Sequence, residues 1–304
     1  MKHTILVTGS NGLLGQKIIY AALNNPEINL IATAIGANRT KEKSGYTYEE
    51  LDITDEQRID FLFEKYKPNT LINTAASTNV DLCEKNREQA KLLNADAVAF
   101  MAKACKKHNT HFIHLSTDFV FDGTQGPYDE LAEPNPLSYY AQTKFDGEKI
   151  LMQSDIAWSI LRTIIIYGTV DDGQRSNVVL WTKKSLEQHQ KINVITDQYR
   201  CPTLAEDLAD ACIQCALKKA EGLFHVSGKD FMSIWQAAEI TADFFHLDKS
   251  LMQPVTTAQL NQPAKRPLVT GFVIDKAKRI LNYNPHSFTE GLEIVAGQLN
   301  KTEQ

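Results

Sequence analysis

Tyr140 and Lys144, four residues apart in the segment YAQTK, form the residue pair with the clearest potential for chemistry in this sequence. If the segment is helical, this spacing places both side chains on one face, about 6 Å apart along the axis. An ammonium group beside a phenol stabilises the phenolate and lowers its pKa from about 10, so that tyrosine can act as an acid or base near neutral pH. Tyr139 competes for the role, but only Tyr140 has a lysine four residues later. Because this spacing is common by chance, the pair indicates proton transfer only together with other motifs.

A glycine-rich segment near the N-terminus predicts a nucleotide-binding loop. The segment 8–15 reads TGSNGLLG and lies between a predicted strand and a predicted helix. Gly9 permits the tight turn, Gly12 lets the backbone approach a pyrophosphate, and Gly15 lets the helix pack closely on the strand. The helix N-terminus would present free N–H groups to the anion. The cofactor contacts predicted here are Gly9, Asn11, Gly12, Leu13, Leu14 and Gly15.

The residues after the second predicted strand indicate which dinucleotide the loop favours. An acidic residue at the end of that strand would hold the ribose 2′-hydroxyl of NAD. Here the segment 34–41 reads AIGANRTK, which has two cations and no carboxylate. Arg39 can hold an adenosine 2′-phosphate through paired hydrogen bonds, so we predict NADP(H) in preference to NAD(H). The alternative is that Arg39 only adds charge to a solvated loop.

A polar residue at the end of the fifth predicted strand is a candidate partner for the substrate. The segment 115–123 reads LSTDFVFDG, and Thr117 follows the last residues of the strand. Ligands of open α/β sheets gather at the carboxyl ends of the strands. Thr117 could therefore donate a hydrogen bond to a carbonyl oxygen whose negative charge grows during reduction.

Short β-branched runs alternate with helical stretches through the first two thirds of the chain, and these elements would position the residues named above. The runs are too continuously apolar for half-exposed strands and are typical of a sheet covered on both faces. They lie at 3–8, 29–34, 70–73, 111–116 and 158–166. Apolar residues at helical spacing predict helices over 12–23, 55–66, 87–108 and 139–152. This alternation predicts an α/β fold with a doubly wound parallel sheet of the Rossmann type.

The pattern is looser after about residue 166, where we expect a smaller mixed C-terminal lobe packed on the sheet, with a cleft between them. Helices are predicted there over 176–189 and 203–219. Three pairs have the spacing of a capping box at a helix N-terminus: Thr54 with Gln57, Ser233 with Gln236, and Ser287 with Glu290. We divide the chain into an NADP(H)-binding Rossmann domain over 1–166 and a mainly substrate-binding lobe over 167–304, from which the chain can return to the sheet.

The composition excludes several classes of protein. The 304 residues are 43% hydrophobic and 23% charged, which is an ordinary globular balance. A net charge of −5 gives no field to attract nucleic acid or an anionic membrane. No apolar run approaches the roughly 18 residues that cross a bilayer, and the N-terminus lacks a secretory signal. Five cysteines are typical of reduced thiols, and Cys212 and Cys215 share one predicted helix without a second pair, so no metal site is predicted. We expect a cytoplasmic protein with a small-molecule substrate; the sequence does not determine its oligomeric state, and a homodimer stays open.

Seven motifs, in order along nearly the whole chain, resemble the extended short-chain dehydrogenase/reductase superfamily and, within it, the dTDP-4-dehydrorhamnose reductase family: TGSNGLLG, NTAAS, LSTDFVFDG, YAQTK, LRTIIIYG, DQYRCPT and AKRP. The resemblance implies a catalytic triad of Thr117, Tyr140 and Lys144. Tyr140 would protonate the keto oxygen of a nucleotide-linked 4-keto-6-deoxy sugar while NADPH delivers hydride to the same carbon. Lys144 would bind the nicotinamide ribose, and Thr117 would polarise the carbonyl. The implied reaction converts dTDP-4-dehydrorhamnose to dTDP-rhamnose.

The resemblance also implies further binding residues. Cofactor contacts would come from Asp52 and Ile53 near the adenine and from Ala75 and Ala76 in the cofactor cleft. Substrate contacts would come from Asp118, Phe119, Asn177 and Arg266, the last clamping the nucleotide diphosphate. The sequence departs from the family at three positions near the expected sugar site, where Ser77 and Ile165 replace aromatic residues and Phe119 replaces tyrosine. The reaction type is therefore a firmer expectation than the substrate.

Two other functions stay open on the same fold. One is a sugar-nucleotide epimerase or dehydratase. Dehydratases of the superfamily typically carry Asp-Glu after the catalytic threonine, whereas Asp118 is followed by Phe119, and epimerases usually retain NAD. The other is a non-catalytic regulatory module resembling the β subunit of methionine adenosyltransferase. The retained Thr117, Tyr140 and Lys144 favour turnover over this alternative.

Overall fold

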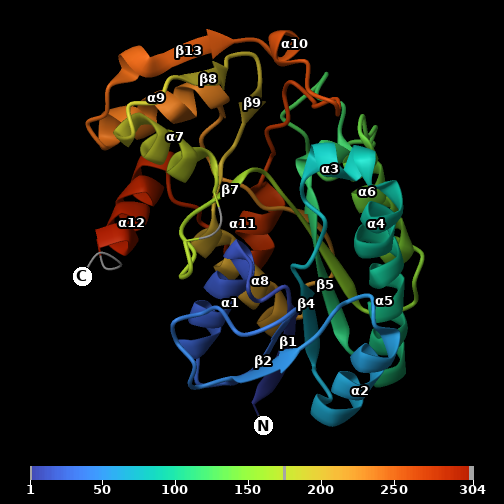
Figure 1. Ribbon diagram of the computed structural model, residues 1–304. Helices are drawn as coiled ribbons and strands as arrows, with labels where there is room; N and C mark the ends of the chain where they lie inside the picture. Colours follow the sequence, from blue (N-terminus) through green and yellow to red (C-terminus); the bar gives the residue numbers. More distant parts are fainter. Residues whose placement is uncertain (1, 174–175, 301–304) are drawn as a thin grey trace.

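Within residues 2–173 and 176–300, the part of the chain that the computed structural model describes, seven parallel strands form one sheet in the order β11-β6-β5-β4-β1-β2-β3 (Figure 1). The strands are β1 (His3–Thr8), β2 (Ile28–Ala34), β3 (Thr47–Glu50), β4 (Thr70–Asn73), β5 (His111–Thr117), β6 (Trp158–Thr163) and β11 (Gly222–His225). The chain builds outward from β1 to β3 and then returns to the other side of β1 with β4, so that the strand order reverses between β1 and β4. The predicted doubly wound parallel sheet is confirmed.

Helices cover both faces of this sheet, and successive residues of a strand alternate between two cores. Ile5 and Val7 of β1 pack in the core beneath α1, α8 and α11, while Leu6 packs in the core beneath α2, α5 and α6. This period of two is the geometry of a strand buried on both sides. The helices are α1 (Leu13–Leu23), α2 (Glu56–Tyr66), α5 (Ala97–His108), α6 (Tyr139–Met152), α8 (Ala205–Lys218) and α11 (Asp275–Leu281).

The long helix predicted over 87–108 is divided into three parts. It runs as α4 (Arg87–Lys91), a π-helical turn η1 (Leu92–Asp96) and then α5. The π turn places Asn94 against neighbouring elements, where its amide donates to Ser77 O at 3.0 Å and to Thr143 Oγ1 at 3.1 Å. A single π turn inside an α-helix was not predicted from the apolar spacing of this segment.

The strand predicted over 158–166 is also interrupted. β6 ends at Thr163, and Ile165 has a positive φ of 26°, which β-branched residues rarely adopt. Thr203 fixes this bend, because its N–H donates to Ile165 O at 3.1 Å and its Oγ1 donates to Ile164 O at 2.6 Å. A short strand, β7 (Ile166–Tyr167), follows and pairs with β10 (Thr203–Leu204).

One predicted helix start is wrong by one residue. Thr54 does not cap α2, since its N–H and Oγ1 both donate to the carboxylate of Asp52. Asp55 caps the helix instead, and its side chain accepts from Arg58 N at 2.9 Å. Asp55 is favoured over Thr54 as the N-cap because its charged oxygen is the stronger acceptor at a helix N-terminus.

The C-terminal lobe joins helices to short strand pairs and lies above the carboxyl ends of the sheet in Figure 1. Both of its predicted capping boxes are present, at Ser233 with Gln236 and at Ser287 with Glu290. Its strands pair as β9 (Tyr199–Arg200) with β12 (Met232–Ser233) and β8 (Ile192–Ile195) with β13 (Met252–Val255). Its helices are α7 (Val178–Glu187), α9 (Ile234–Phe244), η3 (Lys249–Leu251), α10 (Thr257–Leu260) and α12 (Phe288–Asn300). Two shorter elements, α3 (Val80–Lys85) and η2 (Asp118–Val120), belong to the larger part. None of the helices in the described ranges is long and apolar enough to cross a membrane.

Candidate active site

A cavity of about 650 Å³ lies at the carboxyl ends of the central strands, beside the point where the strand order reverses. This is the position at which open α/β sheets bind ligands. Most of the predicted site residues line it: Gly9, Asn11, Gly12, Leu13, Leu14, Gly15, Arg39, Ile53, Ala75, Ala76, Thr117, Asp118, Phe119, Tyr140 and Lys144. The fold therefore gathers segments from residue 9 to residue 144 around one space.

The glycine loop has the close backbone contacts that its sequence predicts. Gly9 has a φ of +70°, and a Cβ added there would lie 2.8 Å from the backbone nitrogen of Ala75. A Cβ added to Gly15 would lie 2.6 Å from the Cα of Ser10. Gly12 is the N-cap of α1 and offers no side-chain acceptor, so the first N–H groups of the helix stay available to an anion.

The loop after β2 is ordered by Asn11. Its amide donates to Ala37 O at 3.0 Å, and its Oδ1 accepts from Arg39 N at 2.9 Å. The Arg39 side chain is 48% exposed, and its Nη1 lies 3.6 Å from Oδ2 of Asp172. The cation predicted to bind a phosphate is thus at the cavity, but it has a carboxylate neighbour from a distant segment.

A second carboxylate also approaches this loop. Glu50, at the end of β3, accepts from Gly36 N at 3.0 Å through Oε1. The sequence around the end of β2 contains no acidic residue, so neither Glu50 nor Asp172 was predicted to lie here. Both come from other elements, and only the tertiary structure brings them to the loop.

Tyr140 enters the cavity from the first turn of α6. The helix begins after Ser138, whose Oγ accepts from Ala141 N at 3.3 Å. The rings of Tyr140 and Phe119 meet edge to face, with centroids 5.9 Å apart. Burial raises the pKa of the Tyr140 phenol, while a hydrogen bond with Thr117 acts in the opposite direction. The sequence predicted that Lys144 would lower the pKa of this phenol, but burial raises it instead, so the phenol is protonated at neutral pH and able to donate.

Lys144 shares the cavity with Tyr140, but its side chain is held by β5. Its Nζ donates to Leu115 O at 2.7 Å and lies 3.3 Å from Nε2 of His114. Burial lowers the pKa of Lys144 to about 8, and the charge of Glu148 opposes this shift. The predicted face-sharing of Tyr140 and Lys144 is present, whereas the amine is directed to the strand.

Asp118 lines the cavity as part of a buried ion pair. Its Oδ2 lies 3.3 Å from Arg200 Nε and accepts from the hydroxyl of Thr270. Arg200 also donates to Pro267 O at 2.6 Å, and its guanidinium lies 5.6 Å from the ring centroid of Phe119. Burial raises the pKa of the Asp118 carboxyl, and Arg200 opposes the rise. Arg200 thus contacts two residues that line the cavity, Asp118 and Phe119, and the DQYRCPT motif was the only sequence signal for it.

Three predicted site residues lie outside the lining of the cavity. Asp52 accepts from Thr54, although the next residue, Ile53, lines the cavity. Asn177 caps α7 and donates to Gly168 O at 2.7 Å. Arg266 forms an ion pair with Asp81 at 2.9 Å. The structure gives each of these side chains a protein partner, so their contacts with cofactor or substrate stay predictions.

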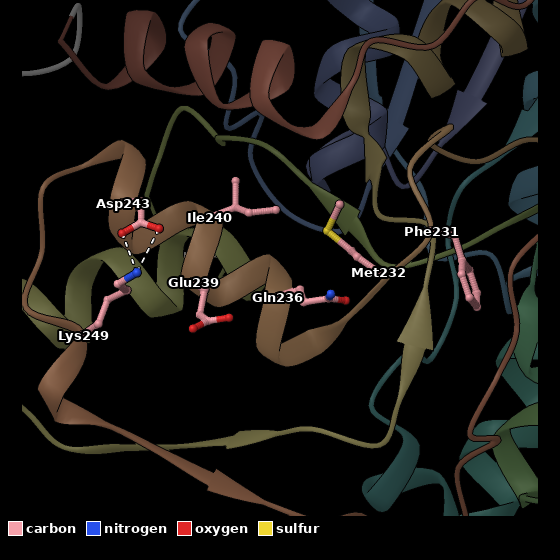
Figure 2. Close-up of a pocket in the computed structure, with 7 residues that line it drawn as sticks. All are labelled: Phe231, Met232, Gln236, Glu239, Ile240, Asp243 and Lys249. Carbon is pink, nitrogen blue, oxygen red and sulfur yellow. Dashed lines mark hydrogen bonds and ion pairs between the residues drawn. The ribbon is translucent and has the colours of Figure 1, made fainter.

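A second hollow, of about 440 Å³, lies on the C-terminal lobe beside α9 (Figure 2). Its lining residues are Phe231, Met232, Gln236, Glu239, Ile240, Asp243 and Lys249. The ammonium of Lys249 bridges both carboxylate oxygens of Asp243, at 2.8 and 3.0 Å. None of the predicted site residues takes part in it, so the chemistry is assigned to the larger cavity.

Comparison with protein families and known proteins adds to this geometry. The family model described as the RmlD substrate binding domain matches residues 1–300. Methionine adenosyltransferase 2 subunit beta of Bos taurus is 31% identical over 268 residues, which cover 86% of this chain and 78% of that protein.

Solved structures with a similar fold include two dTDP-4-dehydrorhamnose reductases. The protein from Clostridium acetobutylicum has a TM-score of 0.86 at 29% identity, covering 98% of this chain and 99% of the other. The protein from Bacillus anthracis, in complex with NADP, has a TM-score of 0.83 at 26% identity, covering 98% of this chain and 100% of the other.

Proposed function

The chain belongs to the RmlD family of extended short-chain dehydrogenases/reductases, and on that premise we propose that it is an NADPH-dependent reductase of a nucleotide-linked 4-keto-6-deoxy sugar. The substrate we propose is dTDP-4-dehydrorhamnose, with dTDP-rhamnose as the product. The observation that carries the proposal is the single cavity in which the glycine loop meets Thr117, Tyr140 and Lys144.

The residues of the cavity fit a dinucleotide. Side chains larger than glycine would clash at Gly9 and Gly15, and the uncapped start of α1 offers N–H groups to a pyrophosphate. The hydroxyl of Ser116 is buried, lines the cavity and has no hydrogen-bond partner among the described residues. Buried polar groups normally have partners, so this hydroxyl is available to a bound molecule. When bound, NADPH would supply the hydride for reduction of the keto group.

Protein groups would supply the proton and the polarisation. The Tyr140 phenol, held protonated by burial, would donate its proton to the sugar oxygen that becomes a hydroxyl. The neighbouring Thr117 hydroxyl would donate a hydrogen bond to the same oxygen as its negative charge grows. Lys144 would hold the nicotinamide ribose from the next turn of α6.

The wall beside Tyr140 is apolar, which suits a deoxy sugar. Phe119, Ile165 and Val80 all line the cavity. Such side chains would pack against the apolar face and methyl group of a 6-deoxy sugar, whereas a 6-hydroxyl would lose its water partners there. The wall supports the sugar class and leaves the choice of nucleotide to experiment.

The proposed preference for NADPH rests on Arg39, which lines the cavity. A guanidinium can bind a 2′-phosphate with two hydrogen bonds. The NADP in the Bacillus anthracis structure supports the proposal. Asp172 and Glu50 oppose it, because carboxylates near this loop repel a phosphate and can instead accept from a 2′-hydroxyl.

The test follows NADPH absorbance with dTDP-4-keto-6-deoxy-L-sugar beside its UDP and GDP counterparts. We expect oxidation with the dTDP compound, lost in Tyr140→Phe and retained in Tyr139→Phe. Tyr139 is a matched control because it neighbours Tyr140 in sequence but packs against Arg87, with 4.9 Å between the guanidinium and the ring centroid. Turnover only with another nucleotide would keep the reductase and replace the substrate.

A second candidate function is a non-catalytic regulatory subunit. The 31% identity to methionine adenosyltransferase 2 subunit beta favours it. The same cofactor-binding cavity would then hold NADPH without turnover. No oxidation with any keto sugar despite tight NADPH binding, together with altered activity of an added methionine adenosyltransferase, would establish this function over the reductase.

A further inference from the structure

His114 lies fully buried on β5, between a side chain from β4 and one from α6. Its Nδ1 is 3.1 Å from Nδ2 of Asn73, and its Nε2 is 3.3 Å from Nζ of Lys144. The three side chains therefore form a continuous hydrogen-bonded row that ends at the proposed catalytic helix. The donors and acceptors along this row can be assigned from its fixed end.

The fixed end is the amide of Asn73. Its Oδ1 accepts from the backbone N–H of Ala75 at 3.2 Å and from Thr8 Oγ1 at 2.5 Å. If the amide were reversed, its NH2 group would face the N–H of Ala75, and two donors would oppose each other. The NH2 group therefore points to His114 and donates to Nδ1.

This orientation sets the tautomer of His114. Burial lowers the pKa of its imidazole well below the ordinary value, so the ring is neutral. With Nδ1 accepting from Asn73, the proton of a neutral ring resides on Nε2. That N–H points to Nζ of Lys144, where an ammonium would meet it as a second donor. An uncharged amine instead accepts from His114 with its lone pair and donates to Leu115 O, 2.7 Å away.

The charged groups around Lys144 do not offset this preference. Glu148, one turn further along α6, favours the ammonium, but its carboxylate is already paired with Arg162 of β6 at 2.6 Å. Asp118, across the cavity in η2, is paired with Arg200. Tyr140 on the same helix is uncharged at neutral pH because burial raises its pKa.

We propose that His114 is a positioning residue that stabilises the uncharged amine of Lys144 over the ammonium, and that dinucleotide binding, wherever the amine is uncharged, is coupled to uptake of one proton by Lys144. The coupling rests on the proposed cofactor, whose phosphates would favour the ammonium in the same cavity. The proton comes from solvent and stays on Nζ, so no other reactant is needed. His114 thereby acts on the charge of Lys144 without contacting the substrate itself.

The first experiment measures the titration of the Lys144 side chain by NMR of its ¹³Cε–¹Hε groups in the protein without added NADPH, with Lys144→Arg to assign the signal. We expect a midpoint near pH 8, against about 10.4 for an ordinary lysine. His114→Gln can present a carbonyl oxygen to the ammonium and should move the midpoint upward. His111→Gln is the matched control, because the ring of His111 is also on β5 but bonds to Ser159, so the midpoint should stay in place. An ordinary midpoint in the wild type, or an unchanged one in His114→Gln, would overturn the proposal.

The second experiment measures proton uptake on NADPH binding by calorimetry in buffers of different ionisation enthalpy. At about pH 9 the 2′-phosphate is fully ionised, so uptake reports on the protein. We expect uptake approaching one proton in the wild type, little in His114→Gln and none in Lys144→Arg. Binding without uptake would refute the coupling, whereas absence of NADPH binding would refute the proposed cofactor and leave the NMR titration to decide the role of His114.

Discussion

Replacing Glu148 by glutamine should strongly destabilise the protein, because it leaves a buried arginine without a counter-charge. Glu148 on α6 accepts from Arg162 on β6 through both oxygens, at 2.9 Å to Nε and 2.6 Å to Nη2. The side chains are 0% and 1% exposed. The guanidinium also lies 5.1 Å from the ring centroid of Phe121 and 3.5 Å from the ring of His225, which burial keeps neutral. No carboxylate other than Glu148 pairs with Arg162 among the described residues.

The size of the effect follows from this burial. Glutamine keeps the shape of glutamate and one acceptor but removes the charge, so the desolvated guanidinium stays uncompensated. Breaking a buried pair in this way costs about 3–5 kcal/mol. Chains of 150–250 residues lose roughly 2–4 °C per kcal/mol, which corresponds to about 6–20 °C for this change. This chain is longer, so the midpoint of its thermal unfolding should fall by an amount toward the lower end of that range. The result would also show that the ion pair of Arg162 with Glu148 stabilises the fold.

Thermal and urea unfolding of three variants would test this reasoning. Glu187→Gln removes a similar pair on α7, but Lys183 and Glu187 are partly exposed, so the loss should stay below about 0.5 kcal/mol. Replacing both Glu148 and Arg162 by methionine removes both charges and should recover much of the stability. Equal, small losses in Glu148→Gln and Glu187→Gln would refute the argument, as would a double variant no better than Glu148→Gln.

Three further predictions concern the site and its pH dependence. Tyr140→Phe should lower turnover by about 10²–10⁴ with little change in NADPH affinity or melting temperature, measured by initial rates and binding titration; full activity would remove the phenol from the mechanism. Arg39→Ala should weaken NADPH binding by about 1.5 kcal/mol, roughly tenfold, and leave NADH binding nearly unchanged, because only NADPH carries the 2′-phosphate. The expected loss is modest because the Arg39 side chain is half exposed and already lies near Asp172. Equal weakening of both cofactors would contradict a phosphate contact. Burial lowers the pKa of His111 to about 4 and that of His225 to about 3, whereas an unfolded histidine has a pKa of about 6.5. The unfolded chain therefore binds more protons than the folded chain, and the free energy of unfolding should fall as the pH drops from about 6.5 to about 4. Urea unfolding across this range should show the loss, and His111→Gln should reduce its slope. A free energy of unfolding that does not change between about pH 6.5 and about pH 4 would contradict the prediction.

The sequence determined the parts of this protein that depend on neighbours along the chain. Continuous apolar runs placed the strands β1, β2, β4, β5 and β6, because only a strand covered on both faces tolerates apolar residues at every position. The spacing of Gly9, Gly12 and Gly15 predicted the loop, since at each of these positions between strand and helix the backbone leaves little room for a side chain. Helical spacing put Tyr140 and Lys144 on one face. Each of these inferences uses only residues that are close together in the sequence.

Local sequence patterns predicted the wrong element bounds where a contact with a distant residue changed the backbone conformation. Thr203 bends the chain at Ile165 and ends β6 earlier than the apolar run predicts. Asn94, in the π turn, bonds to Ser77 and Thr143, which interrupts a helix that apolar spacing predicts to be continuous. Neither bond leaves a mark in the periodicity of the sequence.

Only the tertiary structure decided the electrostatics of the site. Asp118 was predicted to contact substrate, but its carboxylate is paired with Arg200, 82 positions away in the chain. Arg39 was predicted to meet a phosphate in a loop without acids, yet Asp172 comes from beyond β7 to lie beside it. Lys144 was predicted beside a phenol, but its Nζ is directed to β5, where it lies 3.3 Å from Nε2 of His114. A residue type states which charge a side chain can carry, whereas burial and partners from distant segments set the charge that it does carry.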